Sequence, residues 1–287
     1  MLKVKFWGVR GTIACPFENY MKYGGNTSCV SVDCDGHLLI FDSGTGIRPL
    51  GNKIIESGQI NTNLFFSHTH WDHISGFPFF KPAYAENLTI NVYCGNLKMH
   101  GSSIFEVLST QMKNPTFPVP IEILKANLQY HDFYANESFN VTNDIEIETS
   151  LLNHPKGATG YRVNFKGSSV CYITDTEHKP KMLDKNILKL IDNSDLVIYD
   201  STYTDEEYPQ YAGWGHSTWQ EGIRLCRDAK AKNLAIFHHD PGHNDNFMDG
   251  IDILAKDSWE GAFVAKEGVE IVVSNDKLEF NEFDDKP

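Results

Sequence analysis

The chain has 287 residues, of which 41% are hydrophobic and 22% are charged, a composition that suits one large globular domain or two small ones. With 25 Lys and Arg against 38 Asp and Glu, its formal net charge is −13. An acidic surface without a Lys/Arg-rich stripe disfavours a long nucleic acid as partner, whereas a small anion held by a bound cation stays compatible. No apolar run approaches the roughly 18–20 residues of a membrane span, so we expect no membrane partner.

The cysteine pattern indicates a reducing environment. The six cysteines contain no CxxC pair, and they are Cys15, Cys29, Cys34, Cys94, Cys171 and Cys226. Several stand inside strand-like runs such as SSVCYI and NVYCG, which is typical of buried, reduced thiols. The start MLKVKFWGVRG does not resemble a signal peptide, and both features together predict a cytoplasmic location.

Short runs rich in Val, Ile, Phe and Tyr predict strands along most of the chain. These strands are expected at 3–9, 29–34, 37–42, 63–67, 88–94, 145–152, 160–165, 168–174, 196–200, 233–238 and 269–274. Helical periodicity predicts helices at 47–57, about 97–112, 182–192, 217–231 and 246–256. The fourth helix begins with two capping-box patterns, Ser217-x-x-Gln220 and Thr218-x-x-Glu221.

This order of elements predicts an α/β fold of two sheets covered by helices, an αββα sandwich. We expect residues 1–287 to form a single domain, because a division into two domains has no obvious boundary. The acidic residues 278–287 are expected to be a solvated C-terminal tail.

Potential metal ligands follow four of the predicted strands. The run FFSHTHWDHISGF (65–77) places three histidines and an aspartate directly after one strand, and other ligand-capable groups follow three more strands at Asn153-His154, Asp175 and His238-His239-Asp240. Strand ends fix the backbone while the following loops leave room for substrate, so this placement predicts a shared metal cleft.

The spacing inside HTHWDH suits more than one metal ion. His68 and His70 are two residues apart, so their side chains point the same way in an extended chain. Asp72 and His73 are adjacent and could serve a second ion if the chain turns into a helix after Trp71. Imidazole and carboxylate together suit Zn²⁺, Mn²⁺ or Fe²⁺, and one further aspartate between two ions would complete a dinuclear site.

The motifs HTHWDH, LLNHP, YITDT and FHHDP, in that order, resemble the metallo-β-lactamase superfamily. More narrowly, FWGVRGTIACP, YGGNTSCVSV and FDSGTGIRPLG are similar to the branch that contains RNase Z and small-molecule phosphodiesterases. The resemblance implies a four-layer αββα metallo-β-lactamase sandwich, with two mixed sheets flanked by helices. It also implies a hydrolase with two divalent metal ions, Zn²⁺ first and Mn²⁺ or Fe²⁺ as alternatives.

The resemblance assigns His68, His70 and His154 to one ion. It assigns Asp72, His73 and His238 to the other ion, with Asp175 bridging the two. His238 is preferred as the last ligand because it stands at the strand end, and His239 remains the alternative.

The same resemblance implies two catalytic residues. His216 in GWGHSTWQEG corresponds to a histidine that assists the phosphodiester reaction, and Asp72 could accept a proton from the bridging water besides binding metal. Other residues could have a functional role, but an ordinary structural role explains each of them as well. Asp42 could orient a metal ligand or the Gly44–Gly46 turn, and that turn could bind a phosphate. The remaining candidates are Asp240 and His243 near the site, Phe17, Tyr20 and Tyr23 as base-stacking groups, and 203–215 as a lid or interface.

The substrate predicted from these features is small. The terminal histidine ligand, the bridging aspartate and the GHST segment favour phosphodiester cleavage by a metal-bridging water. Bacterial RNase Z carries a tRNA-binding arm between the third-histidine motif and the bridging aspartate, where this chain has only residues 155–174. We therefore predict a phosphodiesterase for small, cyclic nucleotides, active as a homodimer; the alternatives are an RNase Z-like RNA 3′-end endonuclease and a thioester or lactone hydrolase.

Overall fold

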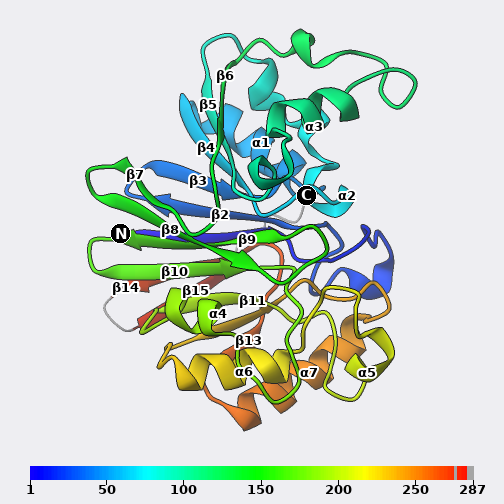
Figure 1. The fold of residues 1–287 in the computed structure, drawn as a ribbon, viewed down its shortest axis with the longest axis vertical. Helices are drawn as coiled ribbons and strands as arrows, with labels where there is room; N and C mark the ends of the chain where they lie inside the picture. The colour runs from blue at the N-terminus through cyan, green and yellow to red at the C-terminus, as the bar shows by residue number, and fades with distance from the viewer. Residues whose placement is uncertain (275–276, 283–287) are drawn as a thin grey trace.

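The computed structural model describes residues 1–274 and 277–282, which form two mixed β-sheets with helices on their outer faces (Figure 1). The first sheet contains, in spatial order, β15 (Lys277–Glu282), β14 (Val269–Ser274), β1 (Leu2–Gly8), β2 (Cys29–Cys34), β3 (His37–Phe41), β4 (Asn61–Phe66), β5 (Thr89–Cys94) and β6 (Asn127–Asp132). The second contains β13 (Ala262–Val264), β12 (Leu234–Phe237), β11 (Leu196–Asp200), β10 (Ser168–Ile173), β9 (Ala158–Phe165), β8 (Ile145–Leu152) and β7 (Ser138–Thr142).

Each sheet is parallel in one half and antiparallel in the other. In the first sheet β3, β4, β5 and β6 pair in parallel, and in the second sheet β10, β11, β12 and β13 do so. The remaining neighbours pair antiparallel. In each sheet the parallel strands finish at the same end of the sheet, and the loops that follow them contribute to the site described below.

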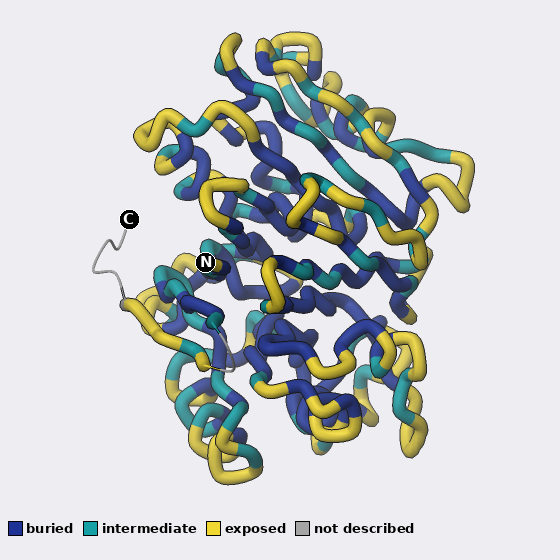
Figure 2. The backbone as a smooth tube through the Cα atoms, turned by 90° about the vertical axis from the view of Figure 1, so that its left-hand side faces the viewer, coloured by how far each residue is buried: buried dark blue, intermediate teal, exposed yellow. Residues whose placement is uncertain are grey.

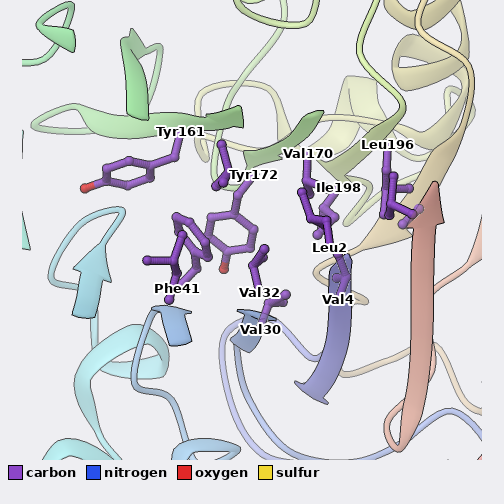
Figure 3. Packing of buried hydrophobic residues seen from close by; sticks show 14 of the residues in the cluster. Leu2, Val4, Val30, Val32, Phe41, Tyr161, Val170, Tyr172, Leu196 and Ile198 are labelled. Atoms are coloured by element: carbon purple, nitrogen blue, oxygen red, sulfur yellow. The ribbon is translucent and has the colours of Figure 1, made fainter. Parts of the chain in front are cut away.

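Three hydrophobic layers hold the sandwich together. The middle layer lies between the sheets, where Phe41, Tyr161 and Tyr172 pack with aliphatic side chains of both sheets (Figure 3). The outer layers lie under helices. The α-helices of the described residues are α1 (Ile47–Ser57), α2 (Trp71–Ile74), α3 (Ile104–Gln111), α4 (Lys185–Leu190), α5 (Tyr208–Tyr211), α6 (Trp219–Asp228) and α7 (Asp245–Ser258), and all of them except α5 contribute side chains to an outer layer.

The layer beneath α1 and α3 covers the first sheet, and the layer beneath α4, α6 and α7 covers the second. Figure 2 shows the result as buried backbone through both sheets and exposed backbone along the outer loops. The predicted αββα architecture with two mixed sheets is therefore confirmed. Within the described residues, no helix has the length and apolar character needed to cross a bilayer.

Several predicted elements have the expected bounds, including the strands at 29–34, 196–200 and 269–274 and the helix at 47–57. The helix predicted at about 97–112 was too long. A short 3₁₀ turn at Lys98–His100 ends at Gly101, which is left-handed with φ 71°, and α3 starts only after Ser103, whose side chain forms a capping box with Glu106. The helix predicted at 182–192 starts late for the same reason, because Asp184 caps Asn186 and Ile187.

The structure also contains strands that the pattern missed, namely β6, β7, β13 and β15. The last of these corrects the predicted tail: Lys277–Glu282 pair antiparallel with β14, and residues 283–287 lie outside the described part of the chain.

Candidate metal centre

The predicted ligands converge at the carboxyl ends of β4, β8, β10 and β12. His68 and His70 follow β4, Asp72 and His73 lie in the one-turn helix α2, and the others follow the remaining strands. Their ligand-capable atoms fall into groups whose members lie within 4.8 Å of one another. One group contains His68, His70, His154 and Asp175; another contains Asp72, His73 and His238; a third joins Asp175, His216 and His238.

Asp175 stands between the first two groups and presents one oxygen to each. Its Oδ1 atom lies 3.7 Å from Nε2 of His68 and 3.8 Å from Nε2 of His154. Its Oδ2 atom lies 3.1 Å from Nε2 of His73 and 3.4 Å from Nε2 of His238. A carboxylate placed in this way can share two cations, which is the arrangement expected of a bridging ligand.

Neighbouring acceptors fix the protonated nitrogen of His73 and His154. Asp42 Oδ2 lies 2.8 Å from His73 Nδ1, and the Gly215 carbonyl lies 2.8 Å from His154 Nδ1. A carboxylate or a carbonyl can only accept, so each Nδ1 carries the proton. Each Nε2 therefore faces the centre. Burial would lower the pKa of His73, but Asp175, Asp72 and Asp42 outweigh it and raise that pKa, so a bound cation would take the place of the proton that these carboxylates favour on the metal-free ring.

Hydroxyl groups have the same effect on His68 and His238. The Ser67 hydroxyl donates to Asp42, and the Thr202 hydroxyl donates to Asp200. Each hydroxyl has given its only proton away and so accepts one from the Nδ1–H of His68 (3.1 Å) or of His238 (2.9 Å). Acceptors behind metal-binding imidazoles commonly fix the ring in this manner.

The resulting concentration of lone pairs fits a bound cation. Nε2 of His68 and Nε2 of His73 are buried and make no hydrogen bond among the described residues. His154 Nε2, with its lone pair inward, lies 3.1 Å from His70 Nδ1. Buried acceptors that face one another without donors are costly, and divalent ions would satisfy them. The residues therefore suit metal binding, as imidazole and carboxylate ligands for Zn²⁺, Mn²⁺ or Fe²⁺.

The electrostatics of the centre agree with this fit. Burial lowers the pKa of His68, His70 and His154, which keeps these imidazoles neutral and able to coordinate. Burial alone would raise the pKa of Asp175, but nearby His238, His73 and His68 outweigh it and hold that pKa below its usual range. Burial would likewise raise the pKa of Asp72, but His73 and His238 lower it. Both carboxylates are therefore ionised and able to coordinate a cation.

His216 lies beside the centre and is paired with a carboxylate that the sequence analysis missed. Its Nδ1 lies 3.0 Å from Asp200 Oδ2, at the end of β11. Burial would lower the pKa of His216, but Asp200 outweighs it and raises the pKa to about 9. Asp200 stands at the end of LVIYD, so the same strand-end rule that selected Asp175 could have found it.

The structure separates His238 from His239. The His238 ring belongs to the centre, whereas His239 is buried with its Nε2 2.9 Å from the Ala265 carbonyl and belongs to none of the groups. The neighbouring candidates are also outside the groups: the Asp240 carboxylate accepts the Gly242 N–H, and His243 Nε2 lies 2.9 Å from Glu207.

The other candidate residues have structural roles. Asp42 orients His73 and the residue behind His68, as predicted. The N–H groups of Gly44 and Gly46 donate to the Ser28 and Thr27 carbonyls, and the Thr45 N–H donates to the Thr27 hydroxyl, so the three backbone donors of this turn are already used. Among the proposed stacking residues, Tyr20 and Tyr23 pack and donate to Pro241 and Asp249, while Phe17 is exposed.

A cavity of about 380 Å³ opens directly onto His68 and His70. A second cavity of about 410 Å³ is lined by His154. His100, Lys156 and Gly157 line both cavities, and Lys156 is the one Lys or Arg among the residues that line either. Small molecules can thus approach the centre past a single cation.

With this geometry established, comparison with known proteins identifies the family. Residues 49–239 match the family model described as the β-lactamase superfamily domain. The chain belongs to this superfamily. This is a family of hydrolases with the metallo-β-lactamase fold, so the predicted family, fold and enzyme class are confirmed.

Named relatives and solved structures agree with that assignment. The ribonuclease Z of Picrophilus torridus is 24% identical over 94% of this chain and 96% of its own length. The metallo-β-lactamase fold protein YhfI of Bacillus subtilis superposes with a TM-score of 0.70 at 17% identity, covering 94% of this chain and 98% of its own. A diphosphatase of the PhnP family superposes with a TM-score of 0.67 at 16% identity, covering 96% and 98%. At such identities the structural matches speak for the fold alone.

Proposed function

We propose that this superfamily member is a dinuclear metal-dependent phosphodiesterase that cleaves small, cyclic nucleotides. The observation that carries the proposal is the double ligand set around Asp175 with the His216–Asp200 pair beside it. His68, His70 and His154 would hold one ion, and Asp72, His73 and His238 the other, with Asp175 shared.

Two bound divalent ions would supply an activated water and positive charge for the oxygens of the phosphoryl group. The chain's own residues would do the remaining work. Asp72 is buried and accepts the backbone N–H of Thr12 at 2.7 Å, which holds its carboxylate in place to bind metal and to receive the proton of the attacking water.

His216 is proposed to protonate the departing ribose oxygen. The Asp200 carboxylate accepts from Nδ1, outweighs burial and raises the pKa of the ring to about 9 in the metal-free chain, which favours the imidazolium form. Nε2 is then the nitrogen left to donate toward the substrate. The same charge would stabilise the phosphoryl oxygens in the transition state.

A small substrate is favoured over RNA by the shape and charge of the chain. Between His154 and Asp175 the chain forms only the hairpin of β9 and β10, whose strands end at Phe165 and begin again at Ser168. The net charge of −13 opposes a long polyanion, whereas Lys156 offers one cation beside the metal centre. Two exposed tryptophans next to site residues, Trp71 and Trp214, could stack on a nucleobase.

The second candidate function is RNA 3′-end processing, which the 24% identity to a named ribonuclease Z favours. One panel separates the candidates: metal content by mass spectrometry, followed by turnover of bis-p-nitrophenyl phosphate, cyclic mononucleotides, cyclic dinucleotides, a precursor tRNA and a thioester. We expect cyclic nucleotides to be the best substrates. Preference for the precursor tRNA would select the second candidate, and preference for the thioester would reject both.

The proposal includes a homodimer in the cytoplasm with Zn²⁺ as the first choice of metal. The six buried, unpaired cysteines are compatible with a reducing compartment. Light scattering of the purified protein tests the dimer, and mass spectrometry of metal retained from cells tests the ion.

A further inference from the structure

We infer that Glu177 is a positioning residue that fixes two of the site histidines, His154 and His216, by holding the backbone turn Gly213–Gly215. The carboxylate of Glu177 accepts the Gly213 N–H through Oε1 at 2.8 Å and the Gly215 N–H through Oε2 at 2.8 Å. Two backbone N–H groups that converge on one anion form a nest, and such charge-assisted hydrogen bonds are short and strong.

Glu177 is itself tied to the loop that carries His154. Its N–H donates to the Asn153 carbonyl at 2.7 Å, and the Asn153 side-chain amide donates back to the Glu177 carbonyl at 2.7 Å. One residue therefore joins three segments: the end of β10 with Asp175, the loop after β8 with His154, and the turn before His216.

The first effect of this clamp concerns His154. The Gly215 carbonyl accepts the His154 Nδ1–H at 2.8 Å, which places the Nε2 lone pair in the centre. Because Glu177 holds the N–H of the same glycine, it restricts rotation of the backbone that aims this carbonyl. Loss of the oxygen that accepts the Gly215 N–H would loosen the carbonyl that fixes the His154 ring.

The second effect concerns His216, which follows Gly215 directly. Its Nδ1 must reach Asp200 at 3.0 Å, and the distance depends on where the turn delivers the His216 Cα atom. Glu177 contacts the backbone of the turn and, at 3.4 Å, the Tyr208 hydroxyl, but no ring of the centre. It is thus not placed to touch substrate, and it acts through the two histidines.

The glycines of the turn show how closely it packs on His154. Gly213 and Gly215 are both left-handed, with φ of 93° and 91°, a conformation that favours glycine. A Cβ atom at Gly213 would meet nothing within 4 Å, whereas one at Gly215 would overlap the His154 ring and Pro155. The two positions share their backbone strain and differ in contact with the metal centre.

The inference rests on the proposed function only in assigning His154 to a metal ion, so the primary readout is metal affinity and not turnover. Divalent zinc is titrated into metal-free wild type, Glu177→Gln and Glu206→Gln, with a competing chelator to resolve the two equivalents. Glutamine keeps the size of Glu177 but offers one acceptor oxygen and turns an amide N–H₂ toward the other backbone N–H. Glu206 is exposed, lies in the loop that leads to the Gly213–Gly215 turn, and serves as the matched control.

We expect Glu177→Gln to weaken one of two zinc equivalents about 10- to 100-fold, the usual effect of losing a group behind a metal ligand, while Glu206→Gln matches wild type. The kcat for a phosphodiester should fall with little change in KM, because both histidines shift but the cavity by Lys156 does not. Gly215→Ala should lose the same equivalent, and Gly213→Ala should keep both.

Wild-type zinc affinities in Glu177→Gln would overturn the role of Glu177, as would equal losses in Gly213→Ala and Gly215→Ala. If wild type binds zinc but hydrolyses no phosphodiester, the proposed function fails and the affinity comparison still decides the role of Glu177. A wild-type chain that binds no divalent ion would overturn both.

Discussion

The Asp42 carboxylate lies behind two of the candidate ligand rings, His73 directly and His68 through Ser67, and replacing it tests the argument about lone pairs. It accepts four hydrogen bonds: from the Ser67 N–H at 2.7 Å, the Ser67 hydroxyl at 2.8 Å, the Tyr172 hydroxyl at 2.9 Å and His73 Nδ1 at 2.8 Å. Asp42 is fully buried, so no water replaces a lost acceptor.

In Asp42→Asn the side chain keeps one acceptor oxygen and places an N–H₂ group against the remaining donors. Three of the four donors reach Oδ2 and the Ser67 N–H reaches Oδ1, so an amide oxygen at the Oδ2 position leaves at least one donor without an acceptor. At about 1–3 kcal/mol for each donor left in this way, the free energy of unfolding falls by at least about 1–3 kcal/mol. The tautomer of His73 is no longer fixed, so affinity for the ion bound with Asp72 and His238 should fall about 10- to 100-fold.

The assay combines urea unfolding of the metal-free protein with zinc titration of the folded protein. Asp33→Asn is the control, because Asp33 accepts a single bond, from Gly36 N–H at 2.8 Å, in the exposed turn between β2 and β3; its loss should cost under about 1 kcal/mol. If Asp42→Asn had the stability and zinc affinity of wild type, the carboxylate would not fix the ligand rings and the reasoning would be refuted.

The remaining predictions concern the centre, the cavity and one distant carboxyl. His238→Ala should lose one metal equivalent and His239→Gln should keep both, as measured by mass spectrometry; the reverse result would make His239 the ligand. Lys156→Ala should raise KM for a cyclic nucleotide about tenfold with kcat retained, and an unchanged KM would place the substrate elsewhere. Burial raises the pKa of Glu267 from its ordinary value of 4.5 to about 7, so its contribution to stability is full below about pH 4.5 and is lost as pH rises through about 7. Urea midpoints at pH 5.5 and 8.5 should therefore fall with pH in wild type and change less in Glu267→Gln; equal slopes would contradict the raised pKa.

The fold could be predicted from sequence where strands are buried on both faces. Strands such as β11, buried at every position, give continuous apolar runs that pattern reading finds. The missed strands β6, β7, β13 and β15 are the four edges of the two sheets. An edge strand packs against one neighbour only, and the alternately exposed NLQYHD of β6 carries too little apolar signal to stand out.

The candidate site was predictable to the extent that ligands follow strands. His238 directly follows β12, and His68, Asp175 and His154 each come two residues after the end of β4, β10 and β8. The support behind them was less visible, because Thr202, Glu177 and the Gly215 carbonyl act through contacts between loops far apart in sequence. Ser67 is adjacent to His68, but its hydroxyl is oriented by Asp42, which is distant in sequence. Hydroxyl and backbone acceptors leave no pattern in a single sequence, so only the folded chain reveals them.

The central claim is that two ions held around Asp175 make this protein a phosphodiesterase. The most direct test is turnover of bis-p-nitrophenyl phosphate by metal-free protein as zinc or manganese is added in measured equivalents, with Asp175→Asn in parallel. The account predicts turnover that rises to a plateau at two equivalents per chain in wild type and stays near background in Asp175→Asn. Wild-type protein that binds two equivalents and leaves the phosphodiester intact would contradict it.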